Sequence, residues 1–93
     1  MNAKVLDTPF QRARGVIGRY PAENERYILR YDSVDERGVH MVGVTRPLHV
    51  TWVADGKITH EVVLEPWTGT ASAKADEIIE ERPVTANSDS TAP

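Results

Sequence analysis

The stretch Leu48–Leu64, which reads LHVTWVADGKITHEVVL, decides the fold. Two runs of alternating apolar and polar residues flank the segment Ala54–Gly56. Alternation of this kind is typical of strands that bury one face, and an Asp-Gly pair between two such runs is a strong hairpin signal. We therefore predict a β-hairpin over Leu48–Leu64, with its tip at Asp55 and Gly56.

Two types of turn could connect the two strands of the hairpin. A two-residue Asp-Gly turn pairs Val53 with Ile58 and puts the apolar residues of the two strands on opposite faces. A three-residue turn, with Gly56 left-handed in a bulge, pairs Trp52 with Ile58 instead. In that register six apolar residues share one face: Leu48, Val50, Trp52, Ile58, Val62 and Leu64. Because a shift of one residue turns every side chain to the other face, burial favours the three-residue turn, and we predict that register.

The N-terminal part predicts a strand and a helix. Asn2–Leu6 suits a short edge strand. Thr8 is a suitable N-cap, Pro9 suits the first helical position, and Gly18 is a plausible stop, which together predict a helix over Pro9–Ile17. The chain therefore starts with one strand and one short helix.

The remaining elements are predicted to be strands. Arg26–Tyr31 alternates like a half-buried strand, Asp32–Gly38 is a polar connection, and Val39–Val44 is a second strand candidate. Asp76–Glu81 is predicted as the last strand, and Pro83 ends regular structure. The fold class is therefore mainly β, a small antiparallel β sandwich or barrel with one short N-terminal helix.

Length and composition limit the architecture and the chemistry. The chain has 93 residues, no cysteine and a formal net charge of −3. This length fits one domain, which we place at residues 1–83, followed by a polar tail at residues 84–93. Without cysteine there is no disulfide framework and no thiol nucleophile. The absence of long apolar runs and of a secretion-signal pattern predicts no membrane span and a place in the cytoplasm or in a larger particle.

The histidines do not form a metal site in this prediction. In the chosen register His49 and His60 point to opposite faces of the hairpin, so they cannot share an ion, and His40 lies elsewhere in the sequence. We expect neither a metal nor a cofactor. Glu61 lies opposite His49, which predicts a cross-strand pair. No serine lies in a nucleophile elbow and there is no glycine-rich phosphate loop, so no catalytic residue is predicted.

Aromatic and charged residues are interpreted as structural or as solvated surface. Trp52 is predicted to lie in the core, and Trp67 to be a large anchor at the corner formed by residues 66–69. The acidic stretch Asp32–Glu36 is interpreted as loop solvation. The arginines of the first half would suit phosphate, which is the weakest option that we consider: Arg12, Arg14, Arg19 and Arg26. Because acidic residues alternate with arginines, we do not expect a nucleic-acid partner.

Several blocks, in order, resemble the family catalogued as domain of unknown function 192. The segment Thr8–Arg19, TPFQRARGVIGR, is similar to the opening motif of that family. The central block is carried by His40-Met41, Pro47-Leu48, Trp52 and Asp55-Gly56-Lys57. The last block is carried by Leu64–Gly69, Ala73–Asp76 and Ile78-Ile79-Glu80. The resemblance covers roughly residues 4–82, in the form common in archaeal members.

The resemblance implies a β sandwich with one short helix and implies no established reaction. Two departures from the family pattern matter. His49 stands where members usually have Asp, and Glu81–Pro83 leads into the polar tail where members continue to a final strand. A missing strand would leave an open sheet edge, and an open edge invites strand addition from another chain.

These observations predict a non-enzymatic interaction module that docks onto a larger assembly, conceivably as a decoration or accessory subunit of a protein shell. The open edge and the C-terminal tail would contact a protein partner or further copies of the chain, and the candidate contact residues are Ile78, Ile79, Val84 and Thr85. The alternative is a small-molecule-binding protein or an enzyme that uses the concave face of the sandwich. The candidate binding residues are His40, Arg46, His49 and Trp67.

Overall fold

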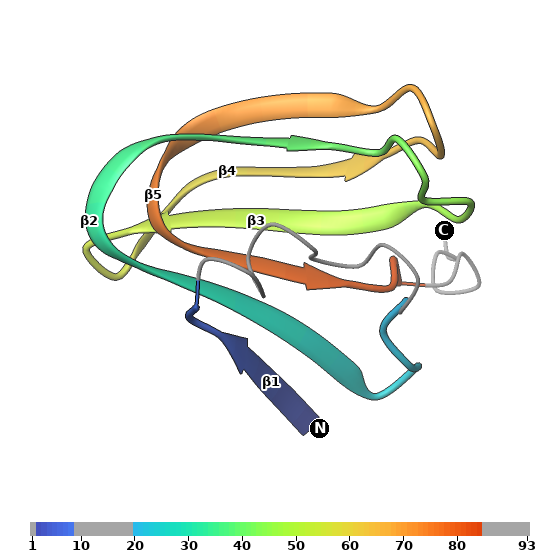
Figure 1. Cartoon of the computed structure of the whole chain (residues 1–93), viewed down its shortest axis with the longest axis horizontal. Helices are drawn as coiled ribbons and strands as arrows, with labels where there is room; N and C mark the ends of the chain where they lie inside the picture. The colour runs from blue at the N-terminus through green and yellow to red at the C-terminus, as the bar shows by residue number, and fades with distance from the viewer. Residues whose placement is uncertain (1, 9–19, 85–93) are drawn as a thin grey trace, which may run out of the picture.

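The computed structural model describes residues 2–8 and 20–84, which form one five-stranded mixed sheet. The strands are β1 (Asn2–Leu6), β2 (Glu25–His40), β3 (Leu48–Ala54), β4 (Lys57–Leu64) and β5 (Thr70–Glu81). Their order is β1-β2-β5-β3-β4, and the sheet is not closed (Figure 1). The mainly β class is therefore confirmed. The described residues contain no helix, and the helix predicted over Pro9–Ile17 lies outside them.

The edge strand β1 is confirmed, but its direction differs from the antiparallel prediction. β1 pairs with β2 in parallel, whereas the other three strand pairs are antiparallel. A parallel pair requires a long crossover between its strands. The chain between β1 and β2 spans residues 7–24, and the antiparallel pairing implied by the predicted fold class was wrong for β1.

The strand β2 is one bent strand of 16 residues, where a strand, a polar connection and a second strand were predicted. Its pairing with β5 shifts register between Arg30 and Asp35, and the two strands curve together at that point (Figure 1). The polar run Asp32–Gly38 was mistaken for a loop because its side chains are mostly exposed on the bend. The prediction for Val39–Val44 was also wrong, because only its first two residues belong to β2. The last strand is confirmed, but it begins six residues earlier, at Thr70.

The hairpin of β3 and β4 is confirmed, but its predicted register is wrong. The turn has two residues, Asp55 and Gly56, both with positive φ (51° and 79°), as a type I′ turn requires. Ile58 pairs with Val53, and the next pair joins Trp52 to His60, so the residue between Ile58 and His60 forms a bulge. The bulge reconciles the tight turn with burial, because it returns most of the apolar residues to one face.

The resulting faces agree with the prediction except at one position. Leu48, Val50 and Trp52 share the inner face with Leu64, Val62 and His60. Ile58 lies on the outer face and is 63% exposed. The bulged Thr59 donates its hydroxyl to the carbonyl oxygen of Lys74 at 2.7 Å. This bond joins β4 to the first half of β5, which lies beside it without a regular ladder.

The core lies on the inner face, where the first half of β2 pairs with the second half of β5. It consists of ten buried apolar residues: Tyr27, Leu29, Met41, Val44, Leu48, Val50, Trp52, Leu64, Ala75 and Ile78. Trp52 is fully buried, as predicted, and its indole Nε1 donates to the carbonyl oxygen of Arg37 at 2.8 Å. This bond ties β3 to the bent part of β2.

Candidate functional site

One end of the molecule is built from two connecting loops, residues 41–47 and 65–69, which we call the loop end (Figure 1). Backbone hydrogen bonds join the two loops. The amide of Met41 donates to the carbonyl oxygen of Gly69 at 3.0 Å, and that of Trp67 donates to Val44 at 3.2 Å. The loop end is therefore a fixed platform for the side chains that it exposes.

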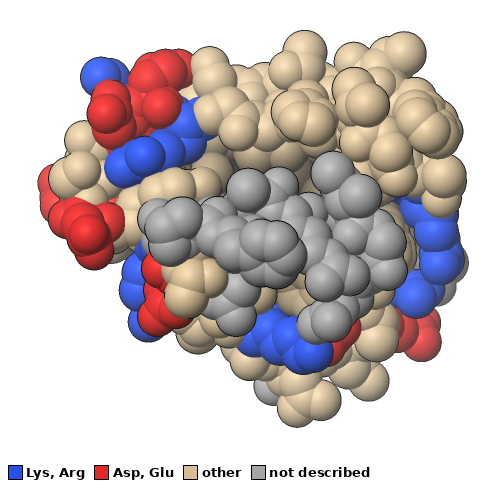
Figure 2. Space-filling model, in the orientation of Figure 1, with Lys and Arg blue, Asp and Glu red and all other residues tan. Residues whose placement is uncertain are grey.

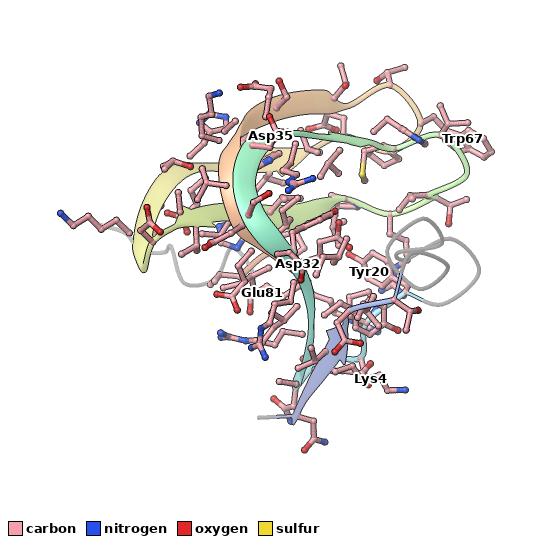
Figure 3. The ribbon with its side chains drawn as sticks, turned by 60° about the vertical axis from the view of Figure 1, so that its left-hand side comes forward. Lys4, Tyr20, Asp32, Asp35, Trp67 and Glu81 are labelled. Atoms are coloured by element: carbon pink, nitrogen blue, oxygen red, sulfur yellow. The ribbon has the colours of Figure 1, made fainter. Side chains whose placement is uncertain are left out.

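Trp67 is exposed at the loop end rather than anchored in a corner. Its side chain is 55% exposed and points away from the ribbon (Figure 3). Its φ is 64°, a strained backbone value for a bulky residue. The turn is tight, because a Cβ added to Gly69 would lie 2.7 Å from the backbone nitrogen of Glu65. Val42, in the other loop, is 59% exposed, so the loop end displays two large apolar side chains.

Two guanidinium groups meet at Tyr20. The Cζ atom of Arg46 lies 4.7 Å from the centroid of the Tyr20 ring, and the Cζ atom of Arg82 lies 5.3 Å from it. Arg82 also donates from Nε to the carbonyl oxygen of Pro21 at 2.8 Å. The Tyr20 hydroxyl donates to the carbonyl oxygen of Pro47, which fixes the ring against the loop end. Burial raises the pKa of Tyr20, and the two arginines lower it to a smaller extent.

The predicted polar groups His40, Arg46 and His49 do not converge. His40 closes β2, and its Nδ1 accepts a bond from the amide of Val42 at 3.3 Å. His49 lies on the outer face, the opposite side of the sheet from the core. Arg46 stacks on Tyr20. The alternative of a shared small-molecule site on the concave face therefore gains no support from this geometry.

His49 belongs to a row of charged groups that crosses four strands on the outer face. Its Nε2 lies 2.9 Å from Glu61, a contact that was predicted, although Glu61 is a diagonal rather than a direct neighbour. Its Nδ1 lies 3.4 Å from Glu81, and Arg26 lies 3.4 Å from the same carboxylate. Ion pairs at such partly exposed positions typically contribute about 0–1 kcal/mol, so this row orients strands more than it stabilises them.

Glu80 is the most unusual polar group of the sheet. It lies in the inner-face row with Tyr27 and Val50, and its side chain is only 4% exposed. Its Oε1 atom has no hydrogen-bond partner in the part of the chain that the structure describes. Burial raises the pKa of Glu80 from 4.5 to about 7. A carboxyl group in this environment is therefore partly protonated near neutral pH.

The predicted partner contacts occupy different environments. Ile78 is 1% exposed and belongs to the core, so it cannot touch a partner unless the sheet opens. Ile79 lies half-buried on the outer face, and Val84 is exposed beyond the end of β5. Thr85 lies outside the described residues. Of the three candidates that the structure describes, Ile79 and Val84 have positions that suit a surface contact.

Charge on the face shown in Figure 2 is mixed, with Lys and Arg next to Asp and Glu. Asp32 and Asp35 lie at the bend of β2 (Figure 3), and both are exposed. Within residues 2–8 and 20–84, no three His, Asp or Glu side chains are grouped to hold a metal ion. The same ranges contain no helix long and apolar enough to cross a membrane.

The sequence contained a signal for Glu80 but none for the pairing at Tyr20. In a strand of period two, Glu80 falls on the same face as the buried Ile78, so alternation alone predicts an inward carboxyl. Tyr20 and Arg82 are 62 residues apart in the sequence, and no local pattern predicts that they touch. Arg46 was predicted as a binding residue, but its contact with Tyr20 was not predicted.

Comparison with known proteins gives a family and a fold. The model of the family catalogued as domain of unknown function 192, described as "Uncharacterized ACR", matches residues 1–90. No curated protein is significantly similar. A crystal structure of a protein of unknown function from Novosphingobium aromaticivorans DSM 12444 superposes with a TM-score of 0.77 at 17% identity, covering 92% of this chain and 66% of that one.

A second solved structure gives the same result. The crystal structure of a putative transcription regulator from Sinorhizobium meliloti 1021 superposes with a TM-score of 0.77 at 17% identity. It covers 98% of this chain and 75% of that chain. The present chain thus spans about two thirds to three quarters of the length of these structures, and at this identity the similarity concerns the fold alone.

Proposed function

The chain belongs to the family of domain of unknown function 192, and from this premise and the open sheet we propose that it is a non-enzymatic interaction module. It accepts an extended segment of a partner protein at the free edge of β1 and works as a small component of a larger assembly. The observation that supports this proposal is the outer side of β1, which has no ladder partner among residues 2–8 and 20–84.

The β1 edge is better suited to strand addition than the β4 edge. In the described residues β1 pairs with β2 alone, and its first four residues are exposed. The β4 edge, in contrast, lies beside the first half of β5 and is bridged to it by Thr59. Strand addition needs backbone N–H and C=O groups that have no ladder partner, and within the described residues β1 has them along one side.

The outward groups of β1 can be identified. The amide of Asn2 donates to the carbonyl oxygen of Asn24 at 2.8 Å, so Asn2 points its backbone groups towards β2. Because these groups alternate along a strand, Lys4 also points towards β2, whereas Ala3 and Val5 point outwards. A partner strand would therefore bond to the backbones of Ala3 and Val5.

The side chains of β1 indicate the chemistry of the partner. Val5 is 40% exposed on the outer face, in one row with Ile28 and Ile79. A β-branched residue in the added strand would continue that apolar row. Lys4 is exposed (Figure 3) and forms no ion pair within the described part of the chain, so an acidic residue opposite it would form a cross-strand pair. We therefore propose an extended segment that carries β-branched and acidic residues.

The test uses a proline that blocks only the outer side of β1. Ala3→Pro removes an outward N–H and leaves the β1–β2 ladder donors in place, and proline is tolerated on edge strands. Eight-residue peptides selected from a displayed random library on the intact protein are measured by fluorescence anisotropy. We expect them to bind the wild-type chain and the control Ala3→Ser equally, and Ala3→Pro at least about tenfold more weakly.

Hydrogen exchange gives an independent readout of the same proposal. A bound peptide should slow exchange of the Val5 amide and leave the Thr51 amide in the central strand unchanged. Peptides that bind Ala3→Pro as tightly as wild type, or a library that yields no binder, would contradict the proposal. The contribution expected from the tail, which starts at the exposed Val84, remains part of the proposal.

A further inference from the structure

We propose that Arg46 and Arg82, which meet at the ring of Tyr20, form a binding site for the dianionic phosphate group of inorganic phosphate or a phosphate monoester. The site lies at the loop end and is separate from the β1 edge. It uses two residues that are far apart in the sequence, which the fold brings to one aromatic ring.

The site is held in place by backbone groups. Arg82 uses its Nε to reach the carbonyl oxygen of Pro21, and Tyr20 uses its hydroxyl to reach that of Pro47. Arg46 is exposed and makes no hydrogen bond or ion pair in the described part of the chain. An arginine has five N–H donors, so most donors of the two guanidinium groups remain free for a ligand.

Among the residues that the structure describes, no carboxylate offsets the charge at this site. Neither Arg46 nor Arg82 has a carboxylate partner among residues 2–8 and 20–84, whereas Arg26 and Arg30 pair with glutamates on the outer face. Two like charges near one ring repel each other, and an anion bound by both groups would relieve that repulsion. Tyr20 does not supply the anion, because burial raises the pKa of its hydroxyl.

The chemistry of the groups favours phosphate over a carboxylate. Guanidinium forks match the oxygen geometry of phosphate and bind it in a bidentate manner. Two guanidinium charges balance a phosphate dianion, whereas a carboxylate or a phosphodiester carries a single negative charge. Since the second pKa of a phosphate monoester is about 6, binding should strengthen between pH 5 and pH 7.5 as the dianion forms.

The test is a titration of the full chain with three small anions at constant ionic strength. Inorganic phosphate, acetate and dimethyl phosphate are added at pH 7.5 while the arginine Nε–Hε signals are followed by NMR. We expect phosphate to shift the signals of Arg46 and Arg82, and the other two anions to bind at least about tenfold more weakly. Equal binding of acetate or dimethyl phosphate would overturn the assignment.

Matched variants separate this site from general surface charge. Arg46→Gln changes an exposed residue and should weaken phosphate binding about tenfold or more. Arg30→Gln removes the same charge from the outer face and should leave binding within about twofold. Loss of binding in both variants, or in neither, would contradict the proposal. Because neither variant alters β1, peptide binding at that edge should be unaffected.

Discussion

Glu80 combines deep burial with an oxygen atom that has no hydrogen-bond partner among the described residues, so its protonation state is linked to the stability of the fold. Its folded-state pKa of about 7 lies above the ordinary value of 4.5. The folded chain therefore binds this proton more tightly than the unfolded chain does. The stability contributed by Glu80 is complete below about pH 4.5 and is lost as the pH rises through 7.

Glu80→Gln should remove this pH dependence. The amide is uncharged and of similar size, so we expect the variant to be more stable than wild type at pH 8, by up to about 3 kcal/mol, and closer to wild type at pH 5. Urea denaturation at both pH values measures the difference. Glu65→Gln, at an exposed position in a loop, is the control and should follow the wild-type profile. Parallel profiles for Glu80→Gln and wild type would rule out the linkage.

The burial or exposure of a single residue can be predicted from the sequence at some positions and not at others. Burial of Trp52 follows from strand alternation, and the structure confirms it. The exposure of Trp67 does not follow from the sequence. It depends on the tight backbone of residues 65–69 and on a positive φ, which is not expected for tryptophan. The site at Tyr20 depends on two distant arginines, so only the folded chain reveals it.

Arg37 makes contacts across the bend of β2. Its guanidinium donates from Nη2 to the carbonyl oxygen of Ser33 at 2.7 Å and from Nε to that of Ala75 at 3.2 Å, and it lies 4.0 Å from the centroid of the Tyr31 ring. These contacts satisfy backbone oxygens at the point where the β2–β5 register shifts. One side chain thus joins both sides of the bend.

Replacement of Arg37 should therefore destabilise the bent pair. We expect Arg37→Gln to lower the free energy of unfolding by about 2 kcal/mol, because two hydrogen bonds to a charged group and one cation–π contact are lost. Arg37→Lys should recover less than half of that loss, since an ammonium cannot reach two carbonyls as a planar fork. Thermal unfolding measures both variants. Full recovery by lysine would show that the charge alone matters.

Strands and turns could be predicted where alternating apolar and polar residues, or the residue types that a tight turn requires, determine the local structure. The hairpin, the edge strand β1 and the end of β5 follow from those signals. The middle of β2 does not, because an exposed bend removes the apolar face that marks a strand. The register of the hairpin was missed because a bulge at Thr59 and a longer turn both restore one apolar face, and alternation does not distinguish them.

The whole molecule should show a gradient of stability across the sheet. β3 and β5 each pair on both sides and hold the most buried side chains, whereas β1 pairs on one side, is short and is largely exposed. Local opening needs least free energy where few contacts are lost. β1 should therefore separate from β2 before the rest of the sheet unfolds.

Native-state hydrogen exchange tests this gradient. The amide of Lys4, which points towards β2, should exchange at least about a hundredfold faster than an amide bonded in the central ladder between β3 and β5. Ala3→Pro should leave that ratio nearly unchanged, because it removes only an outward donor. Equal protection of β1 and the central strands would mean that β1 is an integral part of the core. An edge of low intrinsic stability is also the part of the sheet that an added strand would stabilise most, which links this gradient to the proposed interaction.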